Sequence, residues 1–273
     1  MSDPEQPGQV RRMGRLTEQA EEGLLTYGGY LKVPELLSLQ QLRSDPPVHD
    51  ELLFIVVHQA YELWFKQLLF ELASVRDHMI AGEDERARHE LTRVRAIERV
   101  LIEQIEVLQT MTPQDFLEFR TLLTPASGFQ SVQFREVEFL SGLKEPRYLK
   151  DLAAMPDDFA RLARRLEEPS VWDGFCSLLE RNGLPMPSED EDVRRVSLLA
   201  IADDPAHARL FAVSEGLLDH DESFSTWRYH HVLMVEREIG AKRGTGGSSG
   251  VEYLRSTLGK RFFPELWELR SLL

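Results

Sequence analysis

The sequence lacks cysteine pairs, an excess of positive charge and long uncharged apolar runs. Cys176 is the only cysteine in 273 residues, which excludes an intrachain disulfide and a cysteine-cluster metal site and favours a reducing, cytoplasmic compartment. Lysine and arginine number 32 against 46 aspartate and glutamate, a formal net charge of −14, which argues against binding to nucleic acid or anionic membrane. No stretch reaches the roughly 18 uncharged apolar residues that span a bilayer, and the first residues lack a signal-peptide core.

Strand signals are also scarce. Alternating Val, Ile and Thr runs bounded by Asn-Gly or Asp-Gly turns are missing, whereas apolar residues recur at helical spacing along most of the chain. We therefore predict an all-α fold, a helical bundle. The expected helices span 35–43, 50–80, 84–110, 113–123, 128–142, 156–166, 170–182, 190–217, 221–240 and 251–272.

Capping residues mark two of these boundaries. Thr112, Pro113 and Asp115 supply an N-cap, a proline in the first helical position and an acid in the first turn. Gly240 stands where a helix is expected to end, before the most glycine-rich loop of the chain.

The domain organisation is predicted to be simple. Residues 1–20 carry two prolines and mixed charge with little apolar periodicity, which indicates a flexible arm. No Pro/Ser-rich linker divides the rest, so we predict one helical domain over 21–273. Residues 51–72 are apolar on nearly all sides of a helix, which is typical of a core or an oligomer interface.

His58 is the first candidate for chemistry. It follows Phe54 by one helical turn and shares a stripe with Tyr61 and Phe65. It is either a hydrogen-bonding or basic group in an aromatic pocket, or a buried histidine satisfied by a local hydrogen bond.

His231 is the second candidate. It is centred on the apolar face of its helix, whereas His230 is turned about 100° away. An imidazole that faces an apolar cavity can ligate haem iron without a thiolate. The alternative is a core histidine, because no HxxxH or ExxH pattern surrounds it. The residues that share its face are Phe224, Trp227, Met234 and Val235.

Arg120 and a glycine-rich loop could hold an anion. Arg120 follows Phe116 by one turn, where a guanidinium suits a buried carboxylate; alternatively its stem covers apolar surface while its head reaches water. The loop from Gly244 to Gly250 could present successive backbone N–H groups. It lacks GxxxxGK[ST] and follows a helix, so it is not a nucleotide-binding loop. The alternative to an anion site is a plain flexible connection.

Four segments taken together resemble the tryptophan 2,3-dioxygenases, haem enzymes that open the indole ring of L-tryptophan. They are LTYGGYLKV (25–33), HDELLFIVVHQAYELWFKQLLFEL (49–72), TMTPQDFLEFRTLLTPASGFQSVQFR (110–135) and WRYHHVLMVEREIGAKRGTGGSSGVEYLRSTL (227–258). They occur in the family's order and spacing, and they extend from near residue 25 almost to the end of the chain.

The resemblance implies a haem site. His231 matches the family's proximal ligand of the iron, fourteen residues ahead of Thr245. Ser127, Gly128 and Trp227 match positions beside the haem. The cofactor implied is haem b, one per subunit and ferrous in the active state.

The resemblance also implies a tryptophan site. His58 matches the distal, catalytic histidine that accepts a hydrogen bond from the indole N–H, and it need not act as an obligatory base. Arg120 matches the partner of the substrate carboxylate. Phe54 and Phe116 match aromatic walls of the indole pocket, with Phe116 at a position where family members carry Tyr or Phe. Thr245 and the Gly244 backbone match contacts to the ammonium and carboxylate.

An N-terminal element is implied to complete the site of a neighbouring subunit. Tyr27, Tyr30 and Leu31 match this element, so the resemblance implies an oligomer with exchanged N-terminal segments, in the family a homotetramer.

The expected reaction is cleavage of the indole C2–C3 bond of L-tryptophan by O₂ to N-formyl-L-kynurenine, the first step of tryptophan catabolism by the kynurenine route. The alternatives are a related haem enzyme that inserts one oxygen atom, a haem sensor that binds O₂ and tryptophan without turnover, and a helical interaction protein without haem.

Overall fold

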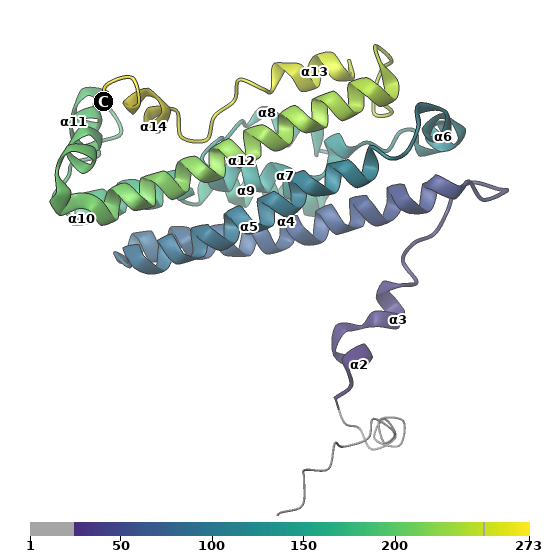
Figure 1. Cartoon of the computed structure of the whole chain (residues 1–273), viewed down its shortest axis with the longest axis horizontal. Helices are drawn as coiled ribbons and strands as arrows, with labels where there is room; N and C mark the ends of the chain where they lie inside the picture. Colours follow the sequence, from purple (N-terminus) through teal and green to yellow (C-terminus); the bar gives the residue numbers. More distant parts are fainter. Residues whose placement is uncertain (1–24, 248) are drawn as a thin grey trace, which may run out of the picture. The chain divides into compact units, whose positions relative to one another are not determined.

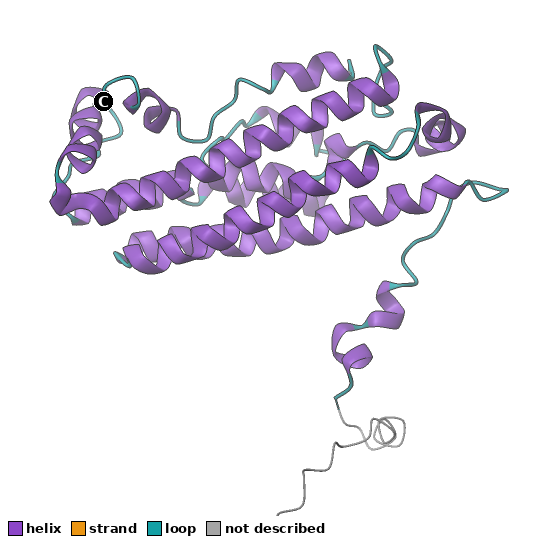
Figure 2. Ribbon diagram, viewed as in Figure 1, coloured by secondary structure: helices purple, strands orange, loops and turns teal. Residues whose placement is uncertain are grey.

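The computed structural model describes residues 25–247 and 249–273, and all regular structure in these residues is helical, as predicted (Figure 2). Contacts within the chain define two units, Met1–Leu42 and Arg43–Leu273. The arm predicted over 1–20 lies outside the described residues, and the single domain predicted over 21–273 stays a prediction.

The described part of the first unit holds two short helices, α2 (Tyr27–Leu31) and α3 (Val33–Leu36). Lys32, in the left-handed conformation with φ 54°, separates them. The helix predicted over 35–43 is therefore wrong in its position, because helical backbone ends at Leu36.

Three long helices form the core of the second unit. α4 (His49–Ala81) packs on α5 (Asp84–Leu108), and α5 packs on α12 (Ala208–Ile239), so that the three run side by side (Figure 1). Gly82 ends α4 with φ 84°, a left-handed conformation that lets the chain reverse directly into α5. Gly240 ends α12, as predicted.

Shorter helices surround these three. α7 packs on α4 and α9, α10 packs on α4, and α13 packs on α12. The described helices are too short or too polar for any of them to span a membrane. The shorter elements are α6 (Pro113–Phe119), η3 (Arg120–Leu123), η4 (Gly128–Gln130), α7 (Val132–Ser141), α8 (Arg147–Asp151), α9 (Pro156–Glu167), α10 (Val171–Arg181), α11 (Glu191–Asp203), η5 (Pro205–His207), α13 (Val251–Ser256) and α14 (Pro264–Leu269).

One helix break was predicted at the wrong position. Helices were predicted over 190–217 and 221–240, but α12 runs without interruption through 218–220. The chain breaks earlier, at Asp204, whose carboxylate accepts the backbone N–H of Ala206 at 2.8 Å. Pro205 follows in the first position of η5, where its fixed φ and missing N–H fit the start of a new helix.

Buried polar pairing explains why the polar stretch around His220 stays helical. The His220 ring bonds to Glu98 Oε1 at 2.6 Å through Nδ1 and to Ser141 Oγ at 2.9 Å through Nε2. Asp221 Oδ2 accepts the backbone N–H groups of Phe262 and Phe263. The side chains of His220 and Asp221 are fully buried and bonded, so they lie inside the bundle instead of ending a helix.

Other predicted helices are divided. The helix predicted over 251–272 is interrupted between α13 and α14, because Pro264 starts a new helix. The helix predicted over 128–142 starts as the short η4, after which Ser131 caps α7. The Thr112 cap forms as predicted, with a reciprocal bond to Asp115.

The outward face of α4 remains apolar. Leu52, Val56, Leu63 and Phe70 are each about half or more exposed, whereas the opposite face is buried against α5 and α10. The sequence left open whether residues 51–72 face a core or an oligomer interface. The core accounts for the buried face of α4 only.

Candidate active site

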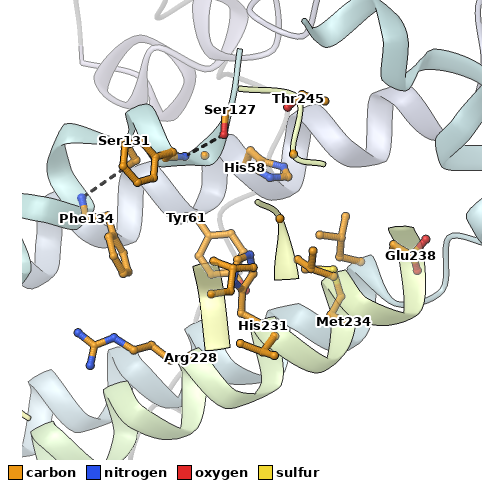
Figure 3. A pocket seen from close by; sticks show the side chains of 18 of the residues that line it. His58, Tyr61, Ser127, Ser131, Phe134, Arg228, His231, Met234, Glu238 and Thr245 are labelled. Carbon is orange, nitrogen blue, oxygen red and sulfur yellow. Dashed lines mark hydrogen bonds between the residues drawn. The ribbon is translucent and has the colours of Figure 1, made fainter. Parts of the chain in front are cut away.

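A cavity of about 300 Å³ lies between α4, α6, α12 and the loops around 125 and 245. This volume is within the range of small-molecule and cofactor pockets. Figure 3 shows His58 from α4 and His231 from α12 directed into it. Ten of the predicted site residues line this cavity: Phe54, His58, Phe116, Arg120, Ser127, Gly128, Trp227, His231, Gly244 and Thr245.

His58 is held in one tautomer. Its Nδ1–H donates to the carbonyl of Phe54 at 2.7 Å, one turn earlier in α4, which leaves Nε2 as an acceptor. Its ring lies 4.0 Å from the ring of Phe54 between centroids. Burial lowers the pKa of His58, although the bond to Phe54 and the charge of Glu62 act in the opposite direction. The ring is therefore a neutral hydrogen-bond acceptor at neutral pH.

His231 presents a neutral imidazole to the cavity. Burial lowers its pKa to about 4, helped by the neighbouring His58. Its ring stacks on Trp227 with centroids 5.0 Å apart and planes 7° apart. No described residue hydrogen bonds to either ring nitrogen.

These features of His231 fit an axial ligand of haem, because a neutral imidazole with an unshared nitrogen lone pair is what such iron binds. Elsewhere in the described residues, no three His, Cys, Asp or Glu side chains converge as a protein-only metal site. The structure thus offers His231 as a nitrogen donor without a competing hydrogen bond, which suits iron already held by a porphyrin.

Aromatic rings form the wall on the α6 side. Phe54 and Phe116 are stacked with centroids 5.8 Å apart and planes 25° apart. Phe119 meets both rings edge-on, at 5.6 and 5.5 Å. This arrangement suits a flat aromatic ligand.

Arg120 and Thr245 tie two loops together at one end of the cavity. The Arg120 guanidinium donates to the carbonyl of Arg243, and Thr245 Oγ1 donates to the carbonyl of Ala126 at 2.7 Å. The loops approach so closely that a Cβ on Gly246 would lie 2.6 Å from the Cβ of Ser127. Glycine at 246 is therefore required for this approach.

Three predicted residues belong to the first unit. Tyr27, Tyr30 and Leu31 lie in α2, with 79%, 71% and 44% of their surface exposed. Their role toward a neighbouring subunit stays a prediction.

Several polar residues of the cavity wall were not predicted from the sequence. Arg135, Glu138, Arg228, Glu238 and Tyr253 all line it. Glu238 follows His231 by seven residues, so the helical stripe could have found it. Its two carboxylate oxygens have no hydrogen-bond partner among the described residues, and burial raises its pKa. Arg135 and Glu138 pair at i,i+3 spacing within α7, but no pattern in the sequence places this pair at the cavity, because the bond from Glu138 to Arg228 comes from a distant helix.

Comparison with known proteins identifies the family of the chain. The family model described as Tryptophan 2,3-dioxygenase matches residues 13–190 and 194–273. A protein named tryptophan 2,3-dioxygenase from Nocardioides sp. is 57% identical over 252 residues, which cover 90% of this chain and 94% of that relative. A protein of the same name from Herpetosiphon aurantiacus is 49% identical over 90% of this chain and 98% of its own length. Another from Myxococcus xanthus is 43% identical over 94% of this chain and 92% of its own length. The chain therefore belongs to the tryptophan 2,3-dioxygenase family.

Proposed function

We propose that the protein is a haem-dependent dioxygenase that cleaves the indole C2–C3 bond of L-tryptophan with O₂ and releases N-formyl-L-kynurenine, the first step of tryptophan catabolism by the kynurenine route. The observation that carries the proposal is the arrangement of two neutral imidazoles, His58 and His231, around one aromatic cavity that ends in a cationic side chain, Arg120. The names of the relatives supply the reaction class.

His231 would hold the iron of haem b, one per subunit, with Ser127, Gly128 and Trp227 beside the macrocycle. Bound in the ferrous state, this group supplies the redox-active centre that O₂ chemistry requires. The remaining work falls to the chain: it binds tryptophan, orients it and keeps water out.

The amino acid would be held at both ends. A carboxylate pairs with the Arg120 guanidinium through charge-assisted hydrogen bonds, and Thr245 with the backbone of Gly244 binds the ammonium and carboxylate. The indole ring then lies against Phe54 and Phe116. A ligand without the carboxylate would leave the guanidinium without an anionic partner, which would favour an α-amino acid.

His58 would fix the rotation of the indole ring. Because Nδ1 is committed to Phe54, only Nε2 faces the ligand, and it can accept the indole N–H. This bond turns the C2–C3 edge in one direction.

The active unit would be a cytoplasmic homotetramer. The apolar face of α4 that includes Leu52 and Phe70, together with the exposed Tyr27 and Tyr30, supports association between copies and exchange of the N-terminal segment. The lone Cys176 suits a reducing compartment.

The proposal is tested by incubating haem-loaded, reduced protein with L-tryptophan in air and identifying the product by mass spectrometry. N-formyl-L-kynurenine formed at a rate proportional to enzyme is the expected result. Protein that binds haem and tryptophan but forms no product would instead be a sensor, and protein that binds no haem would contradict the proposal altogether.

A further inference from the structure

Three charged side chains form a buried triad beside the cavity. Glu138 Oε2 accepts from Arg135 Nη1 at 2.7 Å, and Glu138 Oε1 accepts from Arg228 Nη2 at 2.8 Å. The exposed fractions are 6% for Arg135, 1% for Glu138 and 3% for Arg228. One carboxylate is thus shared by two guanidinium groups, and the triad carries a net charge of +1.

The other groups that contact the triad directly do not cancel its charge. Arg135 also donates to Tyr253 Oη at 3.2 Å and lies 3.9 Å over the ring of Tyr148. Arg228 donates to the carbonyl of Lys260 at 3.2 Å. These partners are neutral.

Nearby charged groups are engaged separately. Glu136, the other carboxylate of this stretch of α7, is paired with Arg161 and Arg165 of α9. Lys260 is paired with Glu145. Glu62, which also lines the cavity, accepts from Ser131 and Gln133. Among the described residues, the charged side-chain groups of Glu136, Lys260 and Glu62 share no hydrogen bond with the triad; only the backbone carbonyl of Lys260 does.

The triad is connected to the residue proposed to hold the iron. Arg228 lies three residues before His231 in α12, less than one helical turn away, and both line the same cavity. Burying three charges costs solvation free energy, and an apolar set of the same volume is often as stable, so fold stability alone does not account for them. In a buried site a fixed charge acts on its neighbours far more strongly than in water.

We propose that the Arg135–Glu138–Arg228 triad sets the reduction potential of the iron bound by His231, its net positive charge favouring the ferrous state. The inference rests on the proposed haem function. Gain of an electron lowers the charge of the iron centre, so a fixed cation nearby stabilises the reduced form. Net charge around the cofactor is one of the means by which a protein adjusts its potential.

The test is a spectroelectrochemical titration of full-length, haem-loaded protein. Arg228→Met takes the triad from +1 to 0 and is expected to lower the potential. Glu138→Gln takes it to +2 and is expected to raise the potential. Arg228→Lys keeps the charge and is expected to stay near the wild type. At a fixed solution potential, each change of one unit charge is expected to alter the ferrous-to-ferric ratio roughly tenfold.

A matched control is an exposed ion pair between α13, which carries Arg255, and α12, which carries Glu236. Arg255→Met removes the cation of the exposed Arg255–Glu236 pair, whose side chains are 57% and 42% exposed, and it is expected to leave the potential unchanged because solvent screens it. Opposite shifts for Arg228→Met and Glu138→Gln would support the proposal, since structural damage alone would move both in one direction. Equal shifts in both variants, or shifts no larger than the control, would overturn it.

Further outcomes distinguish a failure of this inference from a failure of the proposed function. If Arg228→Met fails to retain haem, the comparison of Glu138→Gln with Arg228→Lys decides, and no difference between these two overturns the triad. If the wild-type protein binds haem and cleaves tryptophan but its variants all have the same reduction potential, only this inference is overturned. Wild-type protein that binds no haem overturns the proposed function as well.

Discussion

Replacing His58 with alanine tests whether this histidine orients the indole ring or acts as an obligatory base. The structure assigns Nε2 of His58 as an acceptor, since its Nδ1–H is bonded to the Phe54 carbonyl at 2.7 Å. Losing one such hydrogen bond to a neutral N–H costs about 0.5–1.5 kcal/mol. This range corresponds to a loss in kcat/KM of roughly 2- to 13-fold. An obligatory general base would cost about 10²- to 10⁴-fold.

The assay is kcat/KM for L-tryptophan and for 1-methyl-L-tryptophan, which has no indole N–H. His58→Ala should lower kcat/KM for tryptophan by the smaller range and should not lower it for the methylated substrate, because no hydrogen bond is lost there. His89→Ala, an exposed histidine outside the cavity, is the control. A loss of more than about 100-fold, or an equal loss with both substrates, would refute the orienting role.

Four further results are expected. His231→Ala should abolish stable haem binding while His230→Ala retains it, and a wild-type haem spectrum and affinity in the first variant would rule out the ligand assignment. Arg120→Leu should raise KM for tryptophan by roughly 10- to 150-fold, from the loss of charge-assisted hydrogen bonds, with a smaller effect on kcat; unchanged KM and kcat/KM would exclude the carboxylate contact. Gly246→Ala should raise KM, because its Cβ would overlap the neighbouring loop, whereas Gly259→Ala meets nothing within 4 Å and should be neutral. Burial lowers the pKa of His58 below its usual 6.5, so kcat/KM should stay level from pH 8 to 6.5 and fall only in more acidic solution, as the acceptor nitrogen gains a proton. His58→Ala should lack this fall.

Local patterns predicted the helical class and the ends of helices with strong caps. Thr112 and Gly240 each act on backbone groups within a few residues, so their effect can be recognised in the sequence. The stretch around His220 and Asp221 was misinterpreted as a break because its pairing partners lie far along the chain. The signal at Pro205, an Asp-Pro step, was present in the sequence and marks the true break.

The site residues also divide into those that local patterns predict and those that depend on contacts between distant parts of the chain. His58 and His231 were predicted as candidates because each sits on an apolar helical stripe, and both line the cavity. The choice between a functional histidine and a core histidine could not be made from either stripe alone. It depends on which nitrogen is bonded and which faces the cavity, and those are tertiary facts. The Arg135–Glu138–Arg228 triad was missed for a related reason, since the sequence does not show that α7 meets α12.

Isotopically labelled dioxygen tests whether both atoms of O₂ enter one tryptophan. Haem-loaded, reduced protein is incubated with L-tryptophan under labelled O₂, and the product is analysed by mass spectrometry. The expected product is N-formyl-L-kynurenine carrying two labelled oxygen atoms. A product with one labelled atom would contradict it and identify an enzyme that inserts a single oxygen atom.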